Sequence, residues 1–150
     1  MDKTQLLALI DEAYEKKAWH GPNLRGTLRG VTAEAAAWRP GEGRHNIWEL
    51  TVHAAYWKYA VRRRLTGEKR GSFALKGSNW FARPEGKSGE AEWRKDLELL
   101  GREHRALREA IAKMPKFTEK QLYLVRGIAS HDLYHAGQVS MLKRLWGGAK

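Results

Sequence analysis

Two histidines four residues apart, His131 and His135, stand in the otherwise apolar, helix-like stretch "GIASHDLYHAGQ". Residues at positions i and i+4 lie on one face of a helix, one turn apart. Two imidazoles at this spacing can bind the same divalent ion. The alternative is a pair of core histidines whose ring nitrogens are hydrogen-bonded to a carbonyl or a carboxylate. Burial of both side chains is expected under either interpretation.

The apolar pattern of this helix favours a functional role. Its predicted buried stripe alternates spacings of four and three and consists of Leu124, Ile128, His131, His135, Gln138 and Leu142. Each of the three polar residues in this stripe replaces an apolar side chain whose burial would stabilise the fold. This loss favours a functional role for the three residues over a role in core packing. The zinc-protease motif HExxH is excluded, because Asp132 stands where that motif needs glutamate and no further ligand motif follows.

A third ligand must come from another segment, and His53 is the favoured candidate. It belongs to a predicted helix with an apolar stripe at Ile47, Leu50, Ala54, Trp57 and Val61. At about 100° per residue, His53 lies about 70° from the centre of that stripe, on a flank that faces inward. Glu49, one turn earlier, is a carboxylate alternative. His104 lies on the stripe of a different helix and is interpreted as a core histidine with one satisfied nitrogen.

Other polar and aromatic residues are weaker candidates. Gln138 is expected to orient a ligand or the substrate, and Tyr56 and Trp80 are expected to contact the substrate. Asp132 and Tyr134 are secondary candidates. The remaining assignments are a pocket mouth or helix-break cap for His20, solvent exposure for His45, and an anion site for Lys76 and Arg83.

The composition limits the chemistry that the chain can perform. Its 150 residues predict a single domain, residues 1–150, and its 42% apolar content and seven tryptophans indicate a globular core. The absence of cysteine excludes disulfides, thiolate nucleophiles and cysteine zinc sites, so a metal must be held by histidine and carboxylate. The net charge of +11 is spread along the chain, which favours a role in solubility over nucleic-acid binding.

No apolar run is long enough to span a membrane. The start of the chain, "MDKTQLLALIDEAYEKK", is acidic and polar by its second turn and has no cleavage site of small residues. We therefore expect a cytoplasmic protein.

The periodicity is helical throughout, so an all-α fold is expected. Two short helices are predicted over Leu24–Arg29 and from Thr32 to before Pro40. Four long helices are predicted: from Asp2 to an end or kink at Gly21–Pro22, from Asn46 to Thr66–Gly67, from about Ala91 to Met114, and from Thr118 to Gly147–Gly148.

The lengths of the connections predict the topology. The third and fourth long helices are joined by a few residues and must be antiparallel neighbours. The link between the second and third, from Gly67 to about Gly89, can cross the roughly 30 Å length of a twenty-residue helix. An up-down-down-up four-helix bundle is therefore possible. Because this link is long and contains Phe73, Trp80 and Phe81, it is expected to be a lid or an ordered crossover.

Together, "NIWELTVHAAYWK" (residues 46–58) and "GIASHDLYHAGQVSMLK" (residues 127–143) resemble the DinB/YfiT-like superfamily. They match its helix-two histidine and its HxxxHxGQ signature, and the order of the helices and the long crossover fit as well. The resemblance implies an up-down-down-up bundle, often dimeric, with a divalent metal, commonly nickel or zinc. The metal ligands would be His53, His131 and His135. Known relatives include transferases and isomerases that use low-molecular-weight thiols.

The first hypothesis is therefore a metal-dependent enzyme that activates water or a low-molecular-weight thiol for hydrolysis or group transfer on a small molecule. The alternatives are a non-catalytic metal- or ligand-binding stress protein, and a basic bundle that binds an anionic partner.

Overall fold

The computed structural model describes residues 1–86 and 89–149, and all regular structure in these ranges is helical. The all-α prediction is therefore confirmed. The helices are α1 (Lys3–Tyr14), α2 (Leu24–Leu28), α3 (Ala33–Ala37), α4 (Ile47–Thr66), α5 (Glu90–Lys113) and α6 (Glu119–Ala149). None of the helices in the described ranges is both long and apolar enough to cross a membrane.

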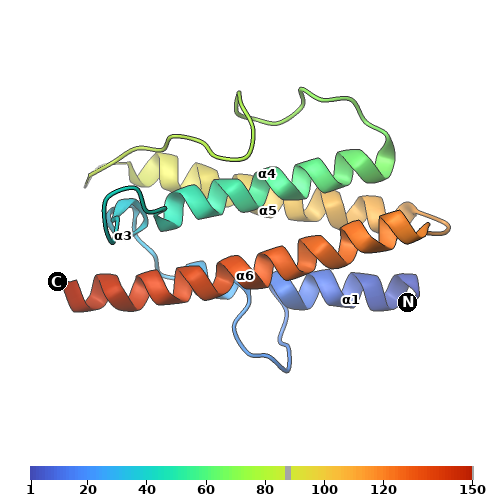
Figure 1. The fold of residues 1–150 in the computed structure, drawn as a ribbon, viewed down its shortest axis with the longest axis horizontal. Helices are drawn as coiled ribbons and strands as arrows, with labels where there is room; N and C mark the ends of the chain where they lie inside the picture. Colours follow the sequence, from blue (N-terminus) through green and yellow to red (C-terminus); the bar gives the residue numbers. More distant parts are fainter. Residues whose placement is uncertain (87–88, 150) are drawn as a thin grey trace.

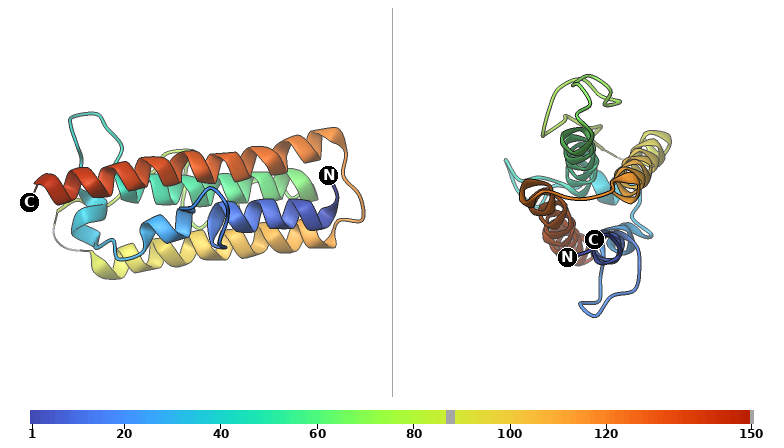
Figure 2. Two further views of the ribbon diagram at one scale, coloured as in Figure 1. Left: turned by 90° about the horizontal axis from the view of Figure 1, so that it is seen from below. Right: turned by 90° about the vertical axis from the view of Figure 1, so that its right-hand side faces the viewer.

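The four long helices lie side by side, with α4 next to α5 and α6, and α1 next to α6 and α5 (Figures 1 and 2). One side of the bundle is thus formed by α4 and α6, and the opposite side by α1 and α5. In Figure 1, α4 and α5 run from left to right, whereas α1 and α6 run from right to left. The crossover between α4 and α5 passes over α4 and returns the chain to the end where α4 began.

Local sequence signals determine where α1, α4 and α6 begin. Asp2 accepts a hydrogen bond from the Gln5 backbone N–H at 2.9 Å, and Asn46 accepts one from Glu49 at 2.8 Å. The glutamine and glutamate side chains return the bond to the cap backbone, which completes two capping boxes. Thr118 and Gln121 form the same reciprocal pair before α6.

Two predicted helix ends differ from the structure. Helix α1 ends at Tyr14, well before Gly21–Pro22, because the next large apolar residue, Trp19, is fully exposed and provides no packing for a further turn. Helix α6 does not stop at Gly147–Gly148 but continues to Ala149. Glycine inside a helix costs only about 1 kcal/mol, which a helix of this length tolerates.

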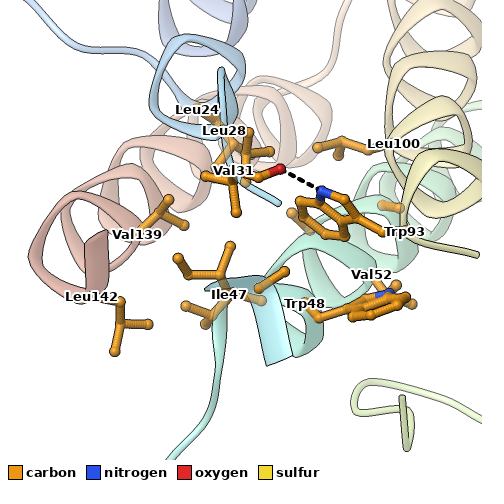
Figure 3. Packing of buried hydrophobic residues seen from close by; sticks show 14 of the residues in the cluster. Leu24, Leu28, Val31, Ile47, Trp48, Val52, Trp93, Leu100, Val139 and Leu142 are labelled. Atoms are coloured by element: carbon orange, nitrogen blue, oxygen red, sulfur yellow. Dashed lines mark hydrogen bonds between the residues drawn. The ribbon is translucent and has the colours of Figure 1, made fainter. Parts of the chain in front are cut away.

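Two buried clusters form the core. The larger one holds Trp48 of α4 and Trp93 of α5, whose rings meet edge to face at 5.4 Å (Figure 3). The Trp93 indole N–H donates to the Val31 carbonyl at 2.7 Å, and the Trp48 indole N–H donates to Asp96 at 2.6 Å. These bonds satisfy the polar edges of both indoles and tie α4, α5 and the α2–α3 link together.

The buried stripe of α6 contains Ile128, His135 and Leu142 as predicted, but the other three predicted residues are replaced by their next neighbours: Val125, Asp132 and Val139. Asp132 is 1% exposed and His135 is buried, whereas His131 is only half-buried. The carboxylate can occupy a core position because the ammonium of Lys58, also 1% exposed, forms an ion pair with it from α4.

Candidate metal centre

The structure brings His53 of α4 together with His131 and His135 of α6. The Nε2 atom of His131 lies 3.1 Å from that of His53 and 3.0 Å from that of His135. His53 and His135 are buried and His131 is half-buried. The side chains that the sequence placed on two different helices thus point their Nε2 atoms at one another, and the group could hold a metal ion.

The spacing of these nitrogens fits ligands of a single ion. Two nitrogens that each lie about 2.1 Å from an ion are about 3.0 Å apart at a right angle and about 3.4 Å apart at the tetrahedral angle. The distances from His131 to its two neighbours correspond to the smaller separation. The three ligand atoms all lie within 4.8 Å of one another. Three protein ligands leave at least one further position of an ion open for water or substrate.

In His53 and His135, hydrogen bonds at Nδ1, the ring nitrogen that points away from the cluster, select the tautomer that can bind a metal through Nε2. The Nδ1–H of His53 donates to the Asn79 carbonyl at 2.9 Å, and the Nδ1–H of His135 donates to Gln138 Oε1 at 2.6 Å. Both residues therefore direct an unprotonated Nε2 at His131. A single N–H on His131 could point at only one of these lone pairs, whereas an ion would bind all three nitrogens.

Burial keeps the three imidazoles neutral. It lowers the pKa of His53 to about 4 and that of His131 to about 3, with a further lowering from the neighbouring histidines. Burial also lowers the pKa of His135. His131 Nδ1 is buried and has no hydrogen-bond partner among the described residues. Metal binding requires the neutral form, so the cluster is ready to bind a cation at neutral pH.

The crossover covers the His53 side of the cluster. The Trp80 indole stacks on the His53 imidazole with 3.9 Å between ring centroids. The His45 imidazole stacks on the same indole with 3.5 Å between centroids. Both imidazoles are nearly parallel to the indole, so they must lie on its opposite faces. Asn79 holds this segment in place, because its carbonyl binds His53 and its Oδ1 accepts from the Trp57 indole at 2.9 Å.

A cavity of about 470 Å³ opens beside His131, between α4 and α6. Its walls include Trp57, Val61 and Ile128, and Arg64 and Arg126 add two cationic groups. A small molecule could reach the cluster from this cavity, because His131 itself is part of the wall.

Several candidates lie away from the cluster. Tyr56 packs against Phe73 and Phe81 and does not line the cavity beside His131. Glu49 is not at the cluster, because it binds Arg39 and caps α4. Arg83 and Lys76 do not meet at an anion site, since the guanidinium of Arg83 binds Asp96 at 2.9 Å and Lys76 is exposed.

The remaining histidines and candidate residues lie outside the three-histidine cluster. His104 is a core residue, as expected, with its Nδ1 3.3 Å from the Lys58 ammonium. His45 is exposed but not merely solvated, because it stacks on Trp80. His20 is exposed. Tyr134 is exposed, and the centroid of its ring lies 5.1 Å from that of His135. Asp132 faces Lys58.

Sequence reasoning missed Asn79, which bonds His53 directly. Its backbone has a φ of 66°, a left-handed conformation that asparagine adopts more readily than most residues. The run Gly77–Ser78–Asn79 inside a long crossover was the available signal for a tight turn. Neither that signal nor the composition indicates which histidine the turn would meet.

A family model described as the DinB superfamily matches residues 18–139. The matched segment contains all three histidines of the cluster, together with Asn79 and Gln138. Neither a curated protein nor a solved structure matches the chain.

Proposed function

Since the chain belongs to the DinB superfamily, we propose that it is a metal-dependent enzyme acting on a small molecule. In this proposal His53, His131 and His135 hold a divalent ion, nickel or zinc. The bound ion would lower the pKa of a coordinated water or low-molecular-weight thiol and polarise a substrate oxygen, for hydrolysis or group transfer.

The convergence of the three Nε2 atoms is the observation that carries this proposal. Asn79 and Gln138 fix the tautomers of two ligands, and Trp80 shields the His53 ring from water. The cavity beside His131 offers an apolar wall for the body of a substrate, with Arg64 and Arg126 available for an anionic group. Since the chain has no cysteine, a thiol used in the reaction must come from a small molecule.

The proposal also covers the bundle topology, the cellular location and the oligomeric state. The bundle is assigned the up-down-down-up topology, which the helix directions in Figure 1 support. The protein is placed in the cytoplasm, where thiols are kept reduced. It is a homodimer that pairs through α6, because Tyr123, Tyr134, Met141 and Leu145 are exposed on that helix.

Metal analysis of protein purified without a histidine tag tests the site. We expect close to one divalent ion per chain in the wild type and loss of the ion in His131→Ala, because two imidazoles alone bind weakly. His20→Ala is the matched control, since His20 is exposed and far from the cluster in sequence. Absence of metal from a folded wild type, even after reconstitution with nickel or zinc, would refute the proposal.

Cobalt(II) substitution distinguishes a thiol from water as the activated group. If a thiol binds the ion, titration with cysteine or 2-mercaptoethanol produces a sulfur-to-cobalt charge-transfer band in the near ultraviolet. The band should be absent in His131→Ala. A cobalt protein that shows no such band, but hydrolyses small esters or amides, would support water. A metal-loaded protein that does neither would be a binding protein rather than an enzyme.

A further inference from the structure

A second cavity lies on the side of the bundle away from the candidate metal centre. Its volume is about 840 Å³, and its walls come from the end of α1, from α2 with the three residues after it, and from α5. The three histidines lie on the α4–α6 side, whereas α1 and α5 form the opposite side (Figure 2, right). The two cavities share no lining residue.

A glycine in the middle of α5 shapes this cavity. A Cβ atom on Gly101 would lie 3.2 Å from Arg105 Nη1 and 3.6 Å from the Tyr14 hydroxyl. Glycine costs about 1 kcal/mol relative to alanine in a helix interior, so its presence there needs a reason. We attribute the glycine to a need for space, because a side chain at position 101 would crowd the guanidinium and the phenol that approach this part of the cavity wall.

Two buried side chains of the wall, Tyr14 and His104, carry hydrogen-bond donors without partners. The Tyr14 side chain is 4% exposed, and its hydroxyl bonds to none of the described residues. His104 is 1% exposed, and its Nδ1 faces the Lys58 ammonium, so the proton of the neutral ring is on Nε2. That N–H has no acceptor within hydrogen-bond distance, since Asp11 and Glu15 lie 3.7 and 3.9 Å away.

The charges at the cavity favour an anion. The guanidinium groups of Arg29, Arg94 and Arg105 form no ion pair with the described residues. The carboxylate of Glu15 is bound by Arg25 at 2.8 Å, which leaves Glu98 as the unpaired acidic group of the lining. The apolar part of the wall consists of Leu28, Val31, Leu97 and Leu100.

We propose that this cavity binds a small organic anion, a phosphate or carboxylate group attached to an apolar body. The anionic group would lie at Gly101, between the Arg105 guanidinium and the Tyr14 hydroxyl, with Arg29 and Arg94 near it. The apolar body would pack on the leucines and valine of the wall. This site is independent of the metal centre and of the reaction proposed there.

Nuclear magnetic resonance of the full ¹⁵N-labelled chain, titrated with phenyl phosphate at constant metal content, tests the site. Two helical glycines report separately on the two cavities, since Gly101 lines this cavity and Gly127 lines the cavity beside His131. We expect the Gly101 amide to shift with saturation, with or without a separate shift of the Gly127 amide, since Arg64 and Arg126 offer an anion a place in the other cavity as well. Shifts at Gly127 alone, or at neither glycine, would overturn the proposal.

Substitutions at the cavity, and probes that carry only one part of phenyl phosphate, test which groups recognise the ligand. Arg105→Ala should weaken phenyl phosphate binding about ten- to a hundredfold, as expected for loss of a charged hydrogen bond. Gly101→Met, which places a side chain where the anionic group would lie, should abolish binding. Arg126→Ala removes the same charge from the other cavity and should leave the affinity measured at the Gly101 amide unchanged.

Equal losses in Arg105→Ala and Arg126→Ala would show only attraction by the +11 net charge and would refute a specific site. Inorganic phosphate and phenol should each bind more weakly than phenyl phosphate. Equal affinity for either part alone would contradict a ligand with two parts. Benzoate in place of phenyl phosphate then tells whether the cavity prefers a carboxylate.

Discussion

At the scale of single residues, the buried histidines make stability depend on pH. Burial, together with the charge of Lys58, lowers the pKa of His104 to about 3, while an unfolded chain titrates near 6.5. Between these values the unfolded state binds more protons than the folded state, so stability falls as pH falls through this window. His53 and His131 act in the same direction.

We therefore expect metal-free His104→Gln to lose less stability than metal-free wild type between pH 6.5 and pH 4. Urea unfolding at several pH values measures this difference. The comparison is made between slopes, since the variant also loses the packing of His104 on Tyr14. Parallel pH profiles for the two proteins would contradict the assignment of a lowered pKa to His104.

Gln138 is a single residue that affects the metal site indirectly, through its hydrogen bond to His135. Gln138→Leu removes the acceptor of the His135 Nδ1–H and so releases both the tautomer and the orientation of the ring. Loss of such an outer hydrogen bond typically lowers metal affinity about ten- to a hundredfold. Competition with a chromophoric chelator measures the affinity, and Ser140→Ala, on the same helix, is the control. An unchanged affinity would exclude a positioning role for Gln138.

At the scale of elements, the buried pair of Lys58 and Asp132 joins the two helices that carry the histidines. Removing one partner leaves an unpaired buried charge, so Lys58→Met should cost about 3–5 kcal/mol of unfolding free energy. The double variant Lys58→Met with Asp132→Leu should recover most of that loss, because two apolar residues replace the pair. Urea unfolding of the single and double variants measures both values.

A double variant that is no more stable than the Lys58 single variant would show that the ion pair is not the source of the loss. Metal content of the double variant then tells whether the pair also sets the distance between α4 and α6. Retained metal would assign the pair to stability alone.

The helices show how far sequence reasoning extends. Capping boxes at Asp2, Asn46 and Thr118 are local, so the starts of α1, α4 and α6 were predictable from residues three positions apart. His131 and His135 were predictable as a pair for the same reason. The burial of Asp132 was not, because it depends on Lys58, a partner 74 residues away in the chain.

The crossover between α4 and α5 shows which part of the candidate metal centre could not be predicted from the sequence. Trp80 was predicted to contact a ligand, but the sequence could not show that it would lie between His45 and His53. A long loop has no periodicity from which its path over a bundle can be inferred. The position of Asn79 against His53 is therefore knowledge that only the structure supplies.

At the scale of the whole molecule, α6 exposes an apolar face. At about 100° per residue, Tyr123, Tyr134, Met141 and Leu145 fall within about 40° of one another on the helix. They are 70%, 66%, 60% and 46% exposed. Gly127 and Gly137 lie on the same face, so a second helix could approach closely. This face borders the cavity beside His131, which Tyr123 and Gly127 line.

A homodimer through this face would cover the apolar side chains and wall off the cavity, with each copy presenting the same patch to the other. We expect light scattering after size exclusion to give twice the chain mass for the wild type. Tyr134→Glu and Met141→Glu should give monomers, because each places charge in the self-complementary patch. Trp19→Glu is the control, since Trp19 is fully exposed but lies outside α6.

A wild type that is monomeric at all accessible concentrations would refute the dimer but leave the metal site intact. If the dimer does form, its dissociation should also expose the cavity. The Glu variants would then retain their metal, because none of the three histidines is changed, but should bind a small apolar substrate less tightly than the dimer. Equal substrate affinity of monomer and dimer would show that α6 pairing plays no part in the site.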